Sequence, residues 1–119
     1  MKLDRQPRAS GPIVTGFAGA GFRIDGTTTS GGVLLTPEWW RAWDGELDES
    51  ALEPLTAVAP EFILVGTGAT LVRPPRDLVA ALDARGIGVE AMDSRAAART
   101  WGVLRGEGRW IAAALAALH

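Results

Sequence analysis

Hydrophobic residues along this chain fall into short runs whose spacing alternates between that of strands and that of helices. Before residue 13 there is no such spacing, so we expect residues 1–12 to form an irregular N-terminal arm and residues 13–119 to form a single domain. Two apolar segments, 13–17 and 22–24, flank a glycine-rich turn. They predict an antiparallel hairpin at the start of the domain.

Further strands are predicted at 33–35, 62–65 and 87–92, with a short one at 69–72. The first two of these runs are apolar on both faces, which is typical of strands buried inside a sheet. We expect 87–92 to be the last strand of the chain.

Two of the predicted helices rest on signals that mark a helix start. A capping hydroxyl, a proline and a carboxylate follow one another at 36–38, and they predict a helix that runs to about Asp44. Capping-box spacing at 50–53 predicts a short helix over 51–58.

Three more helices are predicted in the second half. One covers 77–85 and ends at Gly86, the next is capped by Asp93 or Ser94, and the last begins at about Glu107. The order of elements predicts an α/β fold: a single three-layer domain, in which helices pack on a mixed β-sheet that carries the N-terminal antiparallel hairpin.

Composition narrows the classes of function. The 119 residues are 47% hydrophobic, enough for a packed core, and the longest strongly apolar stretch, 110–118, is far short of the roughly 20 residues of a membrane span. The N-terminus lacks the features of a secretory signal, so we expect a cytoplasmic protein. A net charge of −2 argues against nucleic acid as a partner, because phosphate binding needs a positive excess.

Several catalytic groups are missing. The chain has no cysteine, its one histidine is His119, and its one lysine is Lys2. Thiolate, Ser-His-Asp, His-ligated zinc and Schiff-base chemistries are therefore disfavoured. We predict no catalytic residues, no metal site and no cofactor, and this favours a protein that is not an enzyme.

Two local features are candidates for binding. Gly66-Thr67-Gly68 follows a buried strand, where glycines let backbone N–H groups converge on an anion, and Arg73, Arg76, Arg95 or Arg99 would hold the charge. The alternatives are a tight turn that needs positive φ and, near Arg95 and Arg99, a capped helix with a solvated face.

Tryptophans crowd the segment 39–43. On a helix, Trp39 and Trp43 share a face and fit a core, whereas Trp40 points elsewhere and is hard to bury. Because tryptophan is enriched at binding hot spots, Trp40 is a candidate for binding a protein partner, and an exposed surface residue is the alternative.

Three stretches, 62–68, 86–93 and 97–115, resemble in order and spacing the small-domain family of NADH dehydrogenase complex I assembly factor 3. The family includes an adipogenesis-associated protein and bacterial members of undetermined function. The resemblance covers roughly 12–118, with one departure: Trp101-Gly102 stands where the family commonly has Tyr-Asn or Phe-Asn. It implies a three-layer α/β fold and an assembly or interaction role, without an established reaction.

We therefore expect a non-catalytic protein-interaction or assembly-factor-like domain, monomeric or homodimeric. The alternative is a protein that binds a small anionic ligand, or a modest enzyme, using Gly66–Gly68 and nearby arginines.

Overall fold

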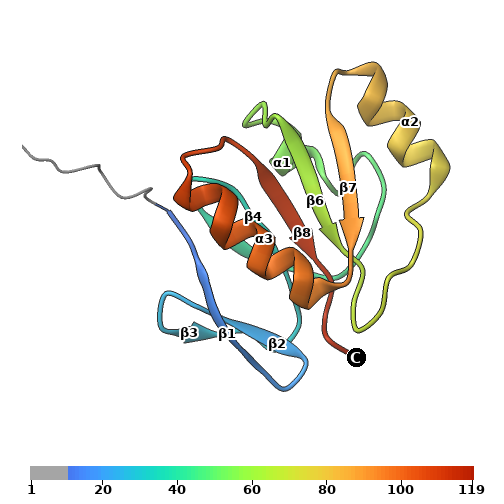
Figure 1. Cartoon of the computed structure of the whole chain (residues 1–119). Helices are drawn as coiled ribbons and strands as arrows, with labels where there is room; N and C mark the ends of the chain where they lie inside the picture. The colour runs from blue at the N-terminus through green and yellow to red at the C-terminus, as the bar shows by residue number, and fades with distance from the viewer. Residues whose placement is uncertain (1–10) are drawn as a thin grey trace, which may run out of the picture.

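The computed structural model describes residues 11–119, which form two β-sheets and three helices (Figure 1). The small sheet is antiparallel and contains β1 (Val14–Ala18), β2 (Gly21–Ile24) and β3 (Thr27–Thr28). The large sheet has the order β5-β4-β8-β6-β7, with β4 (Gly32–Leu35), β5 (Trp40–Trp43), β6 (Phe62–Gly66), β7 (Gly88–Met92) and β8 (Ala112–Leu115). The helices are α1 (Glu53–Thr56), α2 (Arg76–Ala84) and α3 (Ser94–Gly106).

The large sheet is mixed. β4 runs antiparallel to β5 and β8, whereas β6 runs parallel to β7 and β8. The predicted α/β class, the mixed sheet and the N-terminal hairpin are confirmed.

The large sheet is the middle of three layers. On one side lie α3 and the small sheet, and on the other lie α1 and α2 (Figure 1). Side chains alternate between the two cores along the central strands β4, β6 and β8, as a period of two requires. In β4, Val33 and Leu35 join the core under α3, and Leu34 joins the core under α2. Because every described residue of β4 is buried, this strand has no solvent face, as predicted.

The predicted C-terminal helix from Glu107 is wrong. Residues 112–115 form β8, which pairs with β4 and β6 at the centre of the large sheet. Alanine has high helix propensity, but this is a local preference that tertiary packing overrides. Here Ala112 and Ala114 face one core and Ala113 faces the other, all fully buried. Both layers therefore lie close to the central strand.

The predicted helix that ends near Asp44 is also wrong. The hydroxyl of Thr36 accepts hydrogen bonds from the amides of Glu38 (3.1 Å) and Trp39 (3.0 Å), as a helix cap would. However, the Thr36 amide donates to the Trp39 carbonyl (2.9 Å), which closes a tight hairpin turn. The chain returns as β5, with Trp40 opposite Leu35.

The predicted strand at 69–72 is wrong as well, because residues 67–75 contain no strand or helix. The hydroxyl of Thr67 curls this loop: it donates to the Thr70 carbonyl (2.7 Å) and accepts from the Val72 amide (2.9 Å). These local bonds replace the ladder that a strand would need.

The helices at 76–84 and 94–106 confirm two predictions within a residue or two. Gly86 follows α2 with a φ of +78°, and Asp93 caps α3 by accepting a hydrogen bond from the Ala96 amide (2.9 Å). The predicted helix over 51–58 shortens to α1, whose start has no side-chain cap.

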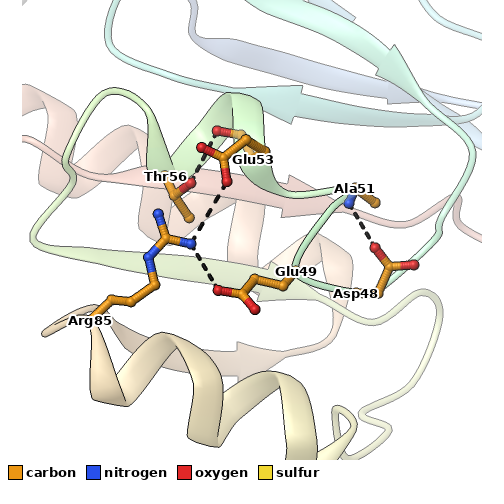
Figure 2. Close-up of polar contacts among 6 residues, drawn as sticks. All are labelled: Asp48, Glu49, Ala51, Glu53, Thr56 and Arg85. Carbon is orange, nitrogen blue, oxygen red and sulfur yellow. Dashed lines mark hydrogen bonds and ion pairs between the residues drawn. The ribbon is translucent and has the colours of Figure 1, made fainter.

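An ion-pair clamp joins the end of α2 to the start of α1 and the segment before it (Figure 2). Arg85 Nη1 lies 2.9 Å from Glu49 Oε2 and 3.7 Å from Glu53 Oε1, and Asp48 accepts from the Ala51 amide (2.7 Å). Both cationic and anionic partners are solvent-exposed, so the clamp mainly sets the position of this segment beside α2.

Candidate functional site

The loop Gly66-Thr67-Gly68 lies at the carboxyl end of β6, beside the first turn of α3. Its backbone amides are used inside the protein. The Thr67 amide donates to the Met92 carbonyl (2.9 Å), and the Gly68 amide donates to the Ser94 hydroxyl (2.8 Å). The predicted convergence of these N–H groups on an anion is therefore not the arrangement seen here.

The structure requires glycine at positions 66 and 68 for two different reasons. A Cβ on Gly66 would lie 2.9 Å from the Ser94 Cα and 3.0 Å from Leu115 Cδ2, so α3 packs directly on the backbone. Gly68 has a φ of +104°, where a side chain is strained. The turn with positive φ, the alternative interpretation of this motif, is present.

The loop does adjoin a small hollow of about 250 Å³. Thr67 and Gly68 are part of its lining, and Asp44 and His119 are the lining residues that have ionisable side chains. The remaining lining residues are Gly32, Trp43, Gly45, Ala116 and Ala117.

Arg95 and Arg99 do not line that hollow. Both are exposed on α3, and the guanidinium of Arg95 lies 5.7 Å from the centroid of the Phe17 ring on β1. Together with the cap on Asp93, this matches the capped helix with a solvated face. The hollow beside Gly66–Gly68 is therefore lined without the two arginines.

The tryptophans of segment 39–43 lie at the edge of the large sheet. Trp40 is half-buried and packs against the core under α3, whereas Trp43 belongs to the opposite core and donates its indole N–H to the Glu46 carbonyl (3.1 Å). Trp39 is half-buried too, with the Arg41 guanidinium 4.0 Å from its ring centroid. The three rings are therefore divided between the two faces of a strand, not between the faces of a helix.

β5 is an edge strand. It pairs with β4, and no other strand within residues 11–119 pairs with it. A groove of about 590 Å³ begins at Ala42 and Trp43 of this strand and continues past Asp44, Glu46 and Ala51. Trp40 thus lies on a strand with an open edge beside an acidic groove.

Sequence reasoning missed two surface features. Leu71 and Val72 are 63% and 57% exposed in the loop before α2. The wrongly predicted strand at 69–72 concealed this exposure, because a strand would have buried one of the two side chains.

The second feature is an ion pair between Arg109 and Glu61 (2.8 Å). The other carboxylate oxygen of Glu61 accepts a hydrogen bond from the Trp110 amide. The hydrogen bond from Arg109, helped by that amide, lowers the pKa of Glu61. Its partners lie 48 residues apart, so spacing gives no signal of it.

Trp101, where the sequence departs from the resembled family, is fully buried. Its indole N–H donates to the Pro12 carbonyl (2.9 Å), and it packs in the core under α3. Gly102 has open space around it. Trp101 therefore has a structural role: it holds the start of the domain against α3.

Some classes of site are not formed by the described part of the chain. No group of three or more aspartate, glutamate or histidine residues in 11–119 could hold a metal ion. No helix in this range is long and apolar enough to cross a membrane.

The mixed three-layer fold defines a class of small α/β domain. Residues 14–116 match the family described as a protein of unknown function (DUF498/DUF598), and the chain belongs to this family. It is 36% identical to an uncharacterised protein of Rhodobacter capsulatus over 112 residues, which cover 93% of this chain and 90% of that protein.

Two further relatives bear on fold and role. NADH dehydrogenase [ubiquinone] 1 alpha subcomplex assembly factor 3 of Danio rerio is 31% identical over 121 residues, covering 97% of this chain and 70% of that protein. A crystal structure of a Bordetella parapertussis protein superposes with a TM-score of 0.82 at 32% identity, covering 93% of this chain and 99% of that one. The resemblance to the assembly factor 3 family is thereby confirmed, as is the fold that it implied.

Proposed function

We propose that this domain is a protein-interaction module of the assembly-factor type and is not a catalyst. The observation that carries the proposal is its relation to an assembly factor along almost the whole chain. An assembly factor acts by binding other proteins, and this function needs a surface rather than a cluster of reactive groups.

The outer edge of β5 is the surface that we assign to this role. An edge strand offers unpaired main-chain groups to a partner, and this is one of the recurring ways in which sheets bind peptides. Trp40 is half-buried on this strand, and an open groove begins at the end of the strand, at Ala42 and Trp43. A partly exposed tryptophan is a common anchor of a protein interface.

The proposal is tested by capture from an extract of the organism that encodes the chain. Wild type, Trp40→Ala and a control, Val103→Ala, are immobilised, and the bound proteins are quantified by mass spectrometry. Val103 is 61% exposed on α3, so its change removes an apolar surface group away from β5. We expect one reproducible partner that wild type and the control retain and Trp40→Ala loses several-fold. Thermal melting of Trp40→Ala confirms that the variant is folded.

Two results would count against the proposal. If no protein is recovered reproducibly, the interaction role fails. If the same partner binds Trp40→Ala as strongly as wild type, the role stands and β5 is the wrong surface.

A small-ligand site at Gly66, Thr67 and Gly68, with Arg95 and Arg99, is the second candidate. The adjoining hollow supports it, whereas the internal use of the loop amides weakens the case for an anion. A thermal-shift series with nucleotides, coenzymes, organic acids and phosphate tests it. A ligand at 100 times its Kd adds about 2.7 kcal/mol, which is a shift of several degrees. A shift that Arg95→Ala or Arg99→Ala abolishes supports this site, and a flat panel contradicts it.

A further inference from the structure

The outer edge of β5 has a defined set of free main-chain groups. The Thr36 amide donates to the Trp39 carbonyl, so these residues form a hydrogen-bonded pair at the end of the β4–β5 ladder. Hydrogen-bonded and non-bonded pairs alternate along an antiparallel ladder, so Trp40 opposite Leu35 is a non-bonded pair, and so is Ala42 opposite Val33. Trp40 and Ala42 therefore direct their N–H and C=O groups away from β4, toward the open edge.

The chain that follows this edge is strongly acidic. Residues 44–53 contain five carboxylates and no basic residue. Arg85 pairs with two of them, Glu49 and Glu53 (Figure 2). The other three, Asp44, Glu46 and Asp48, are exposed, and no ion pair joins them to any residue in 11–119.

Two of these carboxylates, Asp44 and Glu46, line the groove that starts at Ala42 and Trp43, at the end of β5. A second hollow of about 420 Å³ lies between the same segment and α2, and it is lined by Asp48, Glu49 and Asp77 together with apolar side chains that include Leu47 and Leu78. A long basic side chain fits such a hollow, because its stem packs on apolar surface while its charge meets the carboxylates.

On the basis of the proposed function, we infer that the outer edge of β5 takes up an extended, basic segment of a partner protein as a sixth strand. Main-chain bonds to Trp40 and Ala42 hold the segment, and its lysine or arginine side chains meet Asp44, Glu46 and Asp48. Charge complementarity selects this occupant. Phosphate groups of nucleic acids or anionic lipids are repelled by the same carboxylates. A second copy of β5 would bring only Arg41 against them.

Binding of a defined peptide tests the inference. The probe is a fluorescein-labelled seven-residue peptide in which arginine or lysine alternates with valine, and its matched control has glutamate at every basic position. Fluorescence anisotropy is measured in 50 mM salt. We expect the basic peptide to bind at least about tenfold more tightly than the acidic one, and to weaken as salt screens the charges.

Two variants separate charge from strand addition. The triple change Asp44→Asn, Glu46→Gln, Asp48→Asn weakens binding about tenfold, since it removes three exposed ion pairs that each contribute modestly. Ala42→Pro removes an outward N–H without altering charge, and proline is tolerated on the open side of an edge strand. We expect it to weaken binding several-fold as well. Glu90→Gln, which removes one carboxylate from β7 at the opposite edge, serves as the control and leaves binding unchanged.

Any of three results would overturn the inference. The first is that Ala42→Pro, shown by circular dichroism to be folded, binds the basic peptide as tightly as wild type does. The second is that the triple variant binds it as tightly as wild type, and the third is that light scattering finds a dimer that Ala42→Pro converts to monomer, which would make a second copy the occupant. Capture of a native partner that the triple variant and Ala42→Pro retain in full would refute this inference alone. Recovery of no partner at all would refute the proposed interaction function.

Discussion

Ser94 joins three separate parts of the domain through one hydroxyl. It is fully buried at the first residue of α3, where it accepts a hydrogen bond from the Gly68 amide (2.8 Å) and donates one to the Ala116 carbonyl (2.7 Å). The Ser94 amide in turn donates to the Gly68 carbonyl (2.8 Å). The loop after β6, the end of β8 and the start of α3 are thus held together at one point.

We predict that Ser94→Ala destabilises the domain by about 2–4 kcal/mol, because a buried donor and a carbonyl both lose their partner, at about 1–3 kcal/mol for each group left unsatisfied. For a chain of this length, each kcal/mol corresponds to roughly 4 °C in melting temperature. The expected fall is therefore about 8–16 °C, read by differential scanning calorimetry.

Ser30→Ala is the matched control, because Ser30 is exposed in a loop, and it should change the melting temperature by no more than about 2 °C. If Ser94→Ala falls by less than about 3 °C, the two bonds add no net stability and the reasoning is refuted.

Two other predictions concern packing and pH. Gly66→Ala forces a Cβ to within 2.9 Å of Ser94 and should lower the free energy of unfolding, measured in urea, by about 1–3 kcal/mol. Its control, Gly102→Ala, has open space on α3 and should raise the free energy of unfolding by about 0.5–1 kcal/mol. Equal effects of the two changes would refute the close contact at Gly66. Arg109 lowers the pKa of folded Glu61, so the stability it supplies is complete above the ordinary glutamate pKa of about 4.3 and is lost as pH falls through the lowered value. The melting difference between wild type and Glu61→Gln should therefore shrink from pH 7 to pH 3, and a constant difference would contradict this.

Local signals in the sequence were sufficient where the structure also depends on local contacts. The cap at Asp93 and the positive φ of Gly86 are interactions within a few residues, and α3 and α2 were predicted within a residue or two. The buried strand β4 was predicted because apolar side chains on both faces leave few alternatives in a small α/β domain.

The two misassigned strands, β8 and β5, are set by strand pairing, which the local signals in the sequence did not show. β8 is a run of alanines that would suit a helix, and it is a strand because β4, nearly 80 residues earlier, and β6 pair with its two sides. At Thr36 the same side-chain bonds occur in a helix cap and in this hairpin turn, so the signal itself does not distinguish them. The structure is a hairpin because Trp40 pairs with Leu35 across the turn, and the spacing of residues 36–38 does not indicate that pairing.

The candidate sites follow the same division. Gly66-Thr67-Gly68 was found as a motif, but the group that takes up its amide hydrogen bond, Ser94, comes 26 residues later, and so the motif alone could not say that the amide is already used. Trp40 was singled out because a helix could not bury all three tryptophans. The helix was wrong, yet the strand that replaced it has an open edge, and this edge gives Trp40 a stronger reason to contact a partner than the helix did.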